Sequence, residues 1–384
     1  MTNFSQSFVL KSLSSIAFAV FLIGCGINPD KEYAKGLKAF ENADYPLAAK
    51  RFRNVVAESP GNVDALVYLA RSEFALANLD AAEKAIVKAA VTNGEDADIV
   101  ELSAQIAFFK KDYKLATKHY AYLASNPAFD AQTRSKGWAG LGLIDFVMID
   151  IYPEVLRYRH ECRVKFLQSI VLDRRNACSR YYLGRLYRDT FHYLEAAKDE
   201  FDVFVHLLNG SDSRVKRVKN EILPLLKEEI SRSSSISSQV DSPICASFLK
   251  QGDDAFRRKN WKSAITAYLK AYKSDSNSFP AAIGLARAYA RSNRSNLERS
   301  ESMRMYLRAC KLRPSAIAIY IESAQFALST GNFATSVELY SRALAANPTS
   351  RPAAEGLVLA LTKSGDTQAA SVYRGYLRTL GKTK

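Results

Sequence analysis

Residues 36–60 read GLKAFENADYPLAAKRFRNVVAESP, and the placement of aromatic and small residues in this stretch recurs further along the chain. Phe40 is followed at intervals of 34 residues by Phe74 and Phe108. Three other series keep the same interval: Tyr45, Leu79 and Tyr113; Ala48, Ala82 and Ala116; and Phe52, Ile86 and Tyr120. A fixed period of this length indicates structural repeats that stack on one another, because so short a unit cannot bury its own apolar face.

The repeating unit resembles the tetratricopeptide repeat, which consists of two antiparallel helices. In the quoted stretch, Gly36 supplies the small residue of a first helix. Ala48 and, four residues later, Phe52 supply the small and aromatic residues of a second helix, and Pro60 closes the unit. The resemblance implies an all-α fold, a superhelical solenoid of about nine tetratricopeptide-like helix pairs. It also implies that the first helices line a concave side, where peptides and partner helices bind.

The helix pairs fall into two blocks separated by a serine-rich stretch. Seven serines between Ser231 and Ser242 interrupt the periodicity, which indicates a flexible linker. Before this linker, residues 213–230 have the pattern of one further amphipathic helix. In the fourth pair, the residues around Pro153 look like an insertion, and this proline is expected to end the first helix early. The predicted boundaries are an N-terminal block at 30–230 with an insertion near 149–157, a linker at 231–243, a C-terminal block at 244–376 and a polar tail at 377–384.

The first 24 residues have the pattern of an export signal peptide. The apolar run Ser14–Gly24 follows a polar stretch and is shorter than the ~20 residues that a membrane-spanning helix needs. Residues 22–25, LIGC, resemble the bacterial lipobox, in which the cysteine is acylated and becomes the new N-terminus. The resemblance implies lipid attachment at Cys25 and a short tether at residues 25–29. Because Gly26 rather than Asp follows the cysteine, it also implies an outer-membrane anchor that faces the periplasm.

The chain is basic, with 54 Lys and Arg against 39 Asp and Glu and a formal net charge of +15. The excess is concentrated between Lys250 and Arg313, where 15 basic residues accompany 5 acidic ones. Such a field favours partners with acidic segments. Export argues against nucleic acid as the partner, although phosphate contacts scale with basic charge.

The predicted binding residues lie on the first helices, where an apolar half of the concave side would meet a cationic half. We expect partner contacts from Phe40, Phe74, Phe108, Arg185, Arg188, Arg257, Arg287 and Arg291. Arginine suits this role because its guanidinium group pairs with carboxylates through two hydrogen bonds. The structural alternative is that the phenylalanines form the core between repeats and that the arginines are a solvated surface.

The sequence contains no motif for catalysis, for a metal or for a cofactor. The histidines are scattered, and none neighbours a serine or cysteine in the context of a nucleophile: His119, His160, His192 and His206. The cysteines that remain after acylation are expected to be free, mostly buried thiols: Cys162, Cys178, Cys245 and Cys310. We therefore expect a protein that is not an enzyme.

These patterns favour a scaffold that binds other envelope proteins, in assembly, in secretion or as an adaptor for a protease or wall enzyme. One alternative is an envelope enzyme or a cell-wall-binding module carried on the repeats, which a pocket lined by titratable groups beside the insertion would favour. A second alternative is a cytosolic repeat adaptor whose leader is not cleaved. The sequence selects neither the partner nor the oligomeric state.

Overall fold

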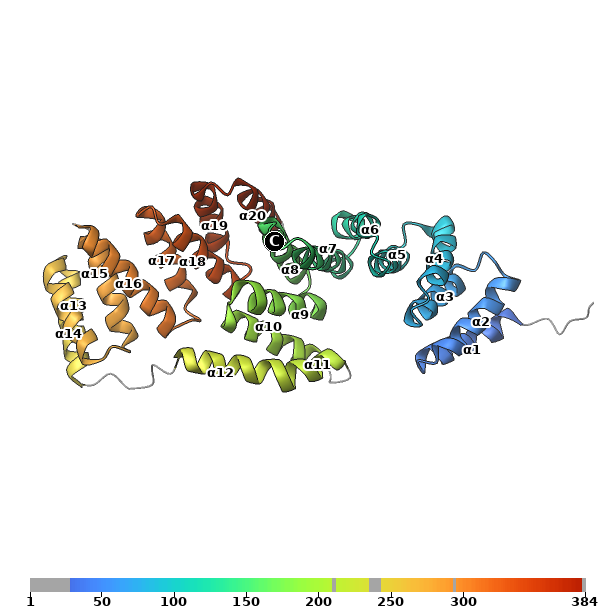
Figure 1. The fold of residues 1–384 in the computed structure, drawn as a ribbon, viewed down its shortest axis with the longest axis horizontal. Coiled ribbons are helices and arrows are strands. Elements are labelled where there is room, and N and C mark those ends of the chain that lie inside the picture. Colours follow the sequence, from blue (N-terminus) through green and yellow to red (C-terminus); the bar gives the residue numbers. More distant parts are fainter. Residues whose placement is uncertain (1–27, 209–211, 235–242, 293–294, 382–384) are drawn as a thin grey trace, which may run out of the picture. The chain divides into compact units, whose positions relative to one another are not determined.

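The computed structural model describes residues 28–208, 212–234, 243–292 and 295–381, and all regular structure in these ranges is helical (Figure 1). The predicted all-α fold is confirmed. The leader, Cys25 and most of the serine-rich linker lie outside the described residues. The chain divides into two compact units, Met1–Gly94 and Glu95–Lys384.

The described part of the first unit contains two helix pairs, α1 (Pro29–Glu41) with α2 (Tyr45–Glu58) and α3 (Val63–Ala75) with α4 (Leu79–Asn93). An Asn or Asp precedes each of α1, α2 and α3, and its side chain accepts a hydrogen bond from a backbone N–H of the first turn. Phe52 of α2 lies against Gly36 of α1, where a Cβ would come within 2.8 Å of the ring. The same ring stacks on Tyr68 of α3 at 5.4 Å between centroids. The small and aromatic residues of the repeat therefore join one pair to the next.

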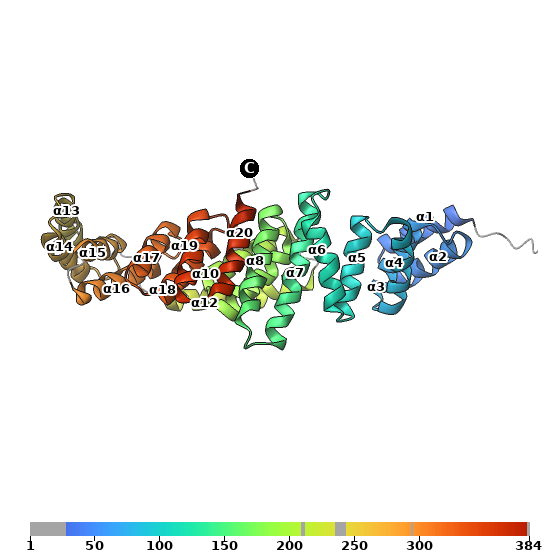
Figure 2. The same cartoon turned by 90° about the horizontal axis from the view of Figure 1, so that it is seen from above.

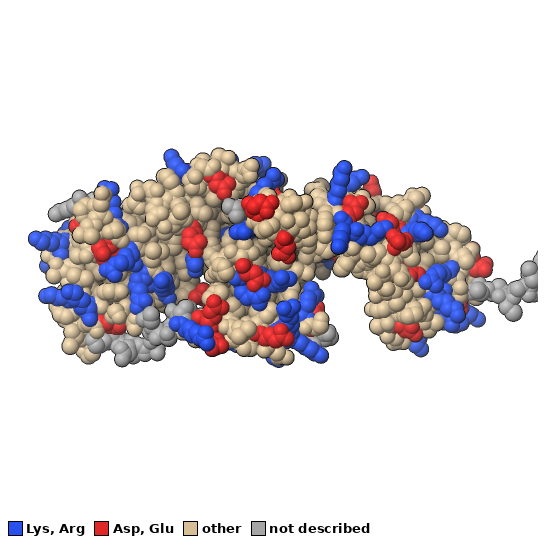
Figure 3. Space-filling view, viewed as in Figure 1, with Lys and Arg blue, Asp and Glu red and all other residues tan. Residues whose placement is uncertain are grey.

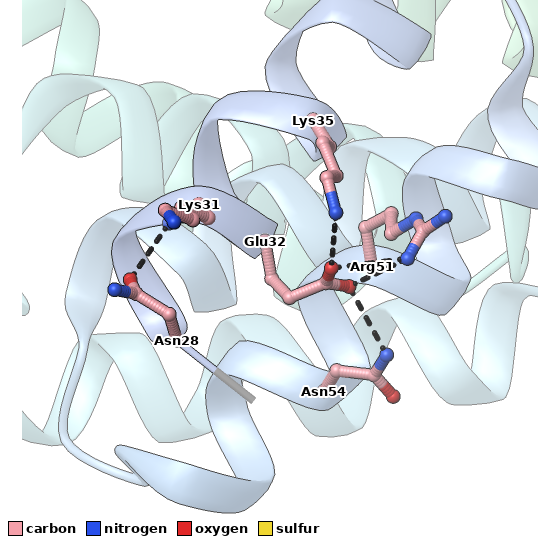
Figure 4. Close-up of polar contacts among 6 residues, drawn as sticks. All are labelled: Asn28, Lys31, Glu32, Lys35, Arg51 and Asn54. Atoms are coloured by element: carbon pink, nitrogen blue, oxygen red, sulfur yellow. Dashed lines mark hydrogen bonds and ion pairs between the residues drawn. The ribbon is translucent and has the colours of Figure 1, made fainter. Parts of the chain in front are cut away.

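A buried carboxylate connects α1 to α2 (Figure 4). Glu32 is 6% exposed and accepts hydrogen bonds from Arg51 at 2.9 and 3.0 Å. Lys35 and Asn54 donate to the same carboxylate at 3.2 and 3.3 Å. The hydrogen bonds from Arg51 lower the pKa of Glu32 to about 2, although burial opposes ionisation. The other residues in this view, Asn28 and Lys31, form the N-terminal cap of α1 at 3.1 Å.

The second unit contains the remaining helices. The first of them are α5 (Ala97–Phe109), α6 (Tyr113–Ser125), α7 (Ala131–Ile151), α8 (Leu156–Leu172), α9 (Ala177–Leu186) and α10 (Leu194–Leu207). One long helical run follows, made of α11 (Ser213–Arg217), π-helical turns at Val218–Ile222 and α12 (Leu223–Ser234). The last pairs are α13 (Pro243–Arg257) with α14 (Trp261–Ser274), α15 (Phe279–Ser292) with α16 (Asn296–Leu312), α17 (Ile317–Ser329) with α18 (Phe333–Ala346), and α19 (Arg351–Ser364) with α20 (Thr367–Leu380). The described residues thus contain the nine predicted pairs. None of the helices in these ranges has both the length and the apolar character needed to cross a membrane.

Tyr268 of α14 illustrates the packing in the second unit. Its ring lies between Gly252 of its own pair and Gly284 of the next pair, and a Cβ at these positions would lie 2.5 and 2.6 Å from the ring. Glycine is needed at both places because carbon atoms in contact are normally about 3.5–4.0 Å apart. Each aromatic side chain of this kind is shared by two neighbouring pairs, so stability depends on stacking.

The insertion in the fourth pair lengthens both of its helices. α7 has 21 residues and α8 has 17, whereas the helices of the first unit have 13 to 15. Pro153 lies in the turn after α7, and Figure 2 shows the connection between α7 and α8 extending beyond the ends of neighbouring helices. Helix α7 does end two residues before Pro153, as predicted, but with 21 residues it does not end early. Proline restricts the residue before it, here Tyr152 with φ −129° and ψ 67°, but it does not prevent the helix from extending up to that point.

The last helix of the chain packs on the fourth pair. Figures 1 and 2 place α20 beside α8, and Arg163 of α8 is fully buried at this contact. Its Nη2 donates to the carbonyl oxygen of Ser341 at 2.6 Å, and its Nη1 donates to the hydroxyl of Tyr373 at 3.4 Å. The rings of Tyr187, Phe191 and Tyr373 lie 5.5 to 5.9 Å from the guanidinium group. No carboxylate pairs with Arg163 among the described residues, so aromatic faces and neutral oxygens stabilise the buried cation.

The α8–α20 contact brings the end of the C-terminal block back against the fourth helix pair. The C-terminal helices do not continue the row after α12; their last pair packs back onto α8. Helix α20 extends to Leu380, four residues into the predicted polar tail, because Tyr373 and Tyr376 are buried on it. The Ser-rich residues 235–242 lie outside the described ranges.

Candidate partner-binding groove

The predicted aromatic residues lie at half-buried positions near the ends of first helices: Phe40, Phe74 and Phe108. The ring of Phe40 packs edge-on against Tyr45 and Tyr68, with centroids 5.5 and 5.4 Å apart. The ring of Phe108 packs against Tyr113 at 5.7 Å. These contacts favour the core interpretation for Phe40 and Phe108. Contact between a partner and the exposed edges of the rings stays a prediction.

Two of the predicted arginines, Arg185 and Arg188, share one internal partner, Asp189. Arg185 and Arg188 lie in the segment that runs from α9 into the π-helical turns at Tyr187–Phe191. The Nε atoms of both side chains face the carboxylate of Asp189, at 3.7 Å from Arg185 and 2.5 Å from Arg188. The guanidinium group of Arg185 also lies 4.9 Å from the ring of Phe146. A partner carboxylate would therefore have to compete with internal contacts at this place.

Arg287 and Arg291 line a cavity of about 620 Å³ in the C-terminal block. The first helices α13, α15 and α17 supply most of its walls, with one residue from α16. We call this cavity the C-terminal groove. Besides the two arginines, its lining includes Phe256, Tyr306, Glu322, Gln325, Phe326 and Ser329. Arg257 is exposed at the end of α13, where it pairs with Asp254, and is not part of the lining.

Charges in the C-terminal groove are partly neutralised. Arg287 donates to both oxygens of Glu322, at 2.8 and 2.7 Å, and this pair joins α15 to α17. Tyr306 donates to the same carboxylate at 3.0 Å. Burial of Glu322 opposes ionisation, but the hydrogen bonds and charge of Arg287 outweigh it, so the pKa of this carboxyl is lowered. Arg291 is exposed and makes no hydrogen bond or ion pair with the described residues, so its donors are open to a ligand, although its charge helps to lower the pKa of Glu322.

The surroundings of the C-terminal groove are basic. On the face drawn in Figure 3, Lys and Arg side chains outnumber Asp and Glu over α13 to α16. This agrees with the excess of basic residues between 250 and 313. A cationic surface raises the association rate of acidic partners more than it raises their final affinity.

Family models described as tetratricopeptide repeat match residues 39–106, 249–314 and 322–381, which together make up about half of the chain. The chain belongs to the tetratricopeptide repeat family. A search of curated proteins found no match.

Solved structures with a similar arrangement include a Pseudomonas aeruginosa protein described under functional characterisation of pilF. It has 15% identity and a TM-score of 0.39 and covers 66% of this chain and 94% of that one. The Cut9–Hcn1 hetero-tetramer of APC/C has 14% identity and a TM-score of 0.38, and the match covers 93% of this chain and 80% of that one. The MamA protein has 15% identity and a TM-score of 0.36, with coverage of 50% and 95%. Similarities at this level do not transfer a partner or a function to this chain.

Tetratricopeptide repeats act generally as scaffolds for protein–protein interaction, and that is the function class of this chain. Among the residues that the structure describes, no group of three His, Cys, Asp or Glu side chains could hold a metal ion. His160 lies at the α8–α20 contact, with its Nδ1 3.4 Å from the hydroxyl of Tyr373. Burial, together with the charge of Arg163, lowers the pKa of His160 to about 4. This half-buried imidazole packs against Tyr373 and Phe191 rather than lying in a catalytic arrangement.

The cysteines inside the repeats are free thiols. Cys162, Cys245 and Cys310 are buried, and Cys178 is half-buried. Burial raises the pKa of Cys178 and of Cys310 to about 11, which keeps both thiols protonated near neutral pH.

A groove lined by titratable groups does lie beside the insertion, the feature that would favour an enzyme or a wall-binding module. Its lining includes Arg157, Glu161 and Lys165 of α8. Arg157 donates to Glu161 at 2.6 Å, and Lys165 donates to the buried carboxylate of Asp145 at 2.6 Å. Burial raises the pKa of Asp145 to about 6 despite the charge of Lys165. The groove therefore has polar binding capacity, but its charged groups already form pairs.

Sequence reasoning missed Glu322 and Tyr306, which set the charge of the C-terminal groove. Glu322 lies 35 residues after Arg287, about one repeat further on the same helix face. From this interval, the pairing of Arg287 with Glu322 could have been predicted from the sequence. The contact of Tyr306 depends on how α16 packs against α17, which the repeat period does not specify.

Proposed function

We propose that this tetratricopeptide repeat protein is a lipid-anchored periplasmic scaffold that binds other proteins of the bacterial envelope through the C-terminal groove. The proposed binding of a partner rests on one observation, the cavity across α13, α15 and α17 in which Arg291 is unpaired within the described residues. The lipobox-like residues 22–25 and the apolar run before them support the anchor and the location.

The lining of the C-terminal groove suggests the chemistry of the partner segment. Arg291 would donate hydrogen bonds to a carboxylate, and Gln325 and Ser329 offer neutral hydrogen-bonding groups beside it. Phe326 and Phe256 add apolar surface within the same cavity. A segment with an acidic residue next to an apolar one fits this combination. The Arg287–Glu322 pair is expected to shape the groove rather than to bind the partner.

Crosslinking tests the groove. A photo-crosslinking amino acid at Gln325 should capture an envelope protein in intact cells, whereas the same amino acid at exposed Lys118 on α6 should not. Arg291→Glu should reduce the captured amount about tenfold or more, the loss expected for a charge-assisted hydrogen bond. Lys273→Glu makes the same charge change at an exposed position of α14 outside the cavity and should leave capture unchanged. Equal capture by the two variants would place the binding face elsewhere.

A second experiment tests the anchor. Cys25→Ser should abolish palmitate labelling and move the chain from the membrane fraction to the soluble periplasmic fraction. Fractionation unchanged from the wild type would remove the anchor from the proposal. Recovery of the chain in the cytosol with its leader intact would favour the cytosolic adaptor.

A further inference from the structure

The turn between α7 and α8 carries a group of exposed apolar side chains. Ile151, Tyr152 and Val155 are 48%, 46% and 37% exposed. Figure 2 shows that this connection extends beyond the ends of the neighbouring helices, so these side chains lie on a projection of the surface. We call residues 150–155 the α7–α8 tip. Large apolar side chains that are grouped on an exposed projection indicate a contact site, because their exposure to water costs free energy.

The conformation of the α7–α8 tip is restrained by contacts within the chain. Pro153 fixes one backbone torsion angle, and its carbonyl oxygen accepts a hydrogen bond from Nη2 of Arg159 at 3.1 Å. The backbone N–H of Val155 donates to the carbonyl oxygen of Tyr152 at 3.0 Å. The ring of Tyr152 also stacks on that of Tyr158, with the centroids 6.3 Å apart. A partner therefore meets a preformed surface, and binding loses little entropy in ordering it.

Two carboxylates accompany the apolar side chains of the tip. Asp150 and Glu154 are exposed, and neither carboxylate makes a hydrogen bond or ion pair with the residues that the structure describes. These charges argue against a lipid bilayer as the partner. A charged side chain inside a bilayer costs about 2.5–3.5 kcal/mol, and anionic lipid headgroups repel a carboxylate. The tip instead fits a protein surface that combines a cation with apolar side chains.

The C-terminal groove has this combination. The donors of exposed Arg291 are open to a ligand, and the half-buried rings of Phe256 and Phe326 lie in the same lining. The basic excess between residues 250 and 313 adds a cationic surrounding. In the α7–α8 tip, each carboxylate is followed directly in the chain by one of the exposed apolar residues. The tip therefore has the chemistry that the lining of the groove suggests for a partner segment.

We propose that the α7–α8 tip of one copy of this chain binds in the C-terminal groove of a second copy. Figures 1 and 2 place α18, α19 and α20 between α8 and the helices of the groove, so a tip does not enter the groove of its own molecule. Because the tip and the groove are different surfaces, the contact is head-to-tail and each copy can contact two others. This inference rests on the groove of the proposed function and adds a second copy as a competing occupant.

Photo-crosslinking between two tagged copies tests the proposal. A single turn buries much less surface than the ~1,200–2,000 Å² of a stable interface, so the contact is transient and a covalent trap is needed. One full-length copy carries a photo-crosslinking phenylalanine derivative in place of Tyr152, and a second copy in the same cells carries a different tag. We expect capture of the second copy at peptides of α15 or α17. Capture of lipid alone, or of other proteins alone, would overturn the proposal.

Charge reversal on each side shows whether the tip and the groove pair with one another. Asp150→Lys with Glu154→Lys in the first copy, or Arg291→Glu in the second, should each reduce capture about tenfold or more. All three side chains are exposed and unpaired within the described residues, so folding should be retained. When the first copy has the lysine tip and the second has Arg291→Glu, opposite charges face each other again and capture should recover. Undiminished capture in the single-sided variants, or no recovery in the combination, would refute the pairing.

A matched control separates this pairing from the effect of net charge. Glu41→Lys with Glu58→Lys makes the same charge change at exposed residues of the first unit. This variant should capture the second copy as well as the wild type does. A loss equal to that of the lysine tip would show that overall charge, and not the tip, determines capture.

Capture from Gln325 distinguishes this inference from the proposed function. The lysine-tip variant should still capture the envelope protein from Gln325, because its own groove is unchanged. Capture of the envelope protein from Gln325 without capture of a second copy from Tyr152 would overturn this inference and leave the proposed function in place. Capture of a second copy from Tyr152 without an envelope protein at Gln325 would support this inference and contradict the proposed function.

Discussion

Replacing Gly356 of α19 with alanine tests the packing rule that holds the repeats together. A Cβ at this position would lie 2.2 Å from Cε1 and Cζ of Tyr340, whose side chain is 3% exposed. Since carbon atoms in contact are normally about 3.5–4.0 Å apart, the ring or α19 has to move by more than an ångström. Overpacking of this kind costs about 1–3 kcal/mol. The better helix propensity of alanine offsets about 1 kcal/mol of that cost.

Gly375 of α20 provides the matched control. It also lies inside a helix of the C-terminal block, but a Cβ there would have no other atom within 4 Å. Gly375→Ala should therefore stabilise the chain by about 1 kcal/mol through helix propensity alone. The two alanine variants should differ in free energy of unfolding by about 1–3 kcal/mol, the packing cost.

Urea unfolding followed by far-ultraviolet circular dichroism measures the difference. Repeat arrays often unfold in more than one step, so the comparison uses the transition that responds to Gly375→Ala. In the Gly356→Ala/Tyr340→Leu double variant the clash is removed, and adding the alanine should cost less than it does beside Tyr340. If Gly356→Ala is as stable as Gly375→Ala, the aromatic ring does not require a glycine opposite it and the reasoning fails.

Four further predictions concern buried and half-buried residues. Arg163→Ala should destabilise the second unit by about 2–5 kcal/mol, because it opens a cavity at the α8–α20 contact. Tyr373→Phe loses only one long hydrogen bond and should cost about 1 kcal/mol or less. Equal urea midpoints for the two variants would contradict this prediction. The pKa of His160 falls from 6.5 to about 4 on folding, so the unfolded chain binds more protons than the folded chain between these pH values. Stability should therefore decrease as pH falls from 6.5 to 4. In thermal melts, His160→Gln should reduce this dependence of the melting temperature on pH. The pKa of Glu32 falls from 4.5 to about 2, so its stabilisation is present above pH 4.5 and is lost toward pH 2, and a Glu32→Gln variant with the same acid midpoint as wild type would contradict that. Cys162, Cys245 and Cys310 should react with a thiol reagent only when the chain unfolds, and rapid labelling of any of them in the native chain would show an opening not present in this fold.

Two residues of the C-terminal groove followed from the sequence, and the rest of its lining and its electrostatics did not. The repeat period placed Arg287 and Arg291 on a first helix, and the structure brings both into one cavity. The same period placed Arg185 and Arg188 on another first helix, where Asp189 pairs with them. Spacing gives the face on which a side chain lies, but the partner of a long, flexible arginine depends on side chains from the neighbouring turn and from the next pair.

The helix pairs themselves were determined by the sequence alone. Gly252 and Tyr268 belong to one pair, and Gly284 belongs to the next, so the contacts that define the repeat join residues close in the chain. A pattern of small and aromatic residues is sufficient to specify such contacts. The docking of α20 on α8 was decided only by the tertiary structure. Arg163 and Tyr373 are 210 positions apart, no period relates them, and in the sequence Arg163 cannot be distinguished from the arginines on the surface. Its burial follows from the aromatic rings that surround it after folding, because those rings, with two neutral oxygens that accept from Nη1 and Nη2, replace much of the water around the guanidinium group, although Nε keeps no partner among the described residues.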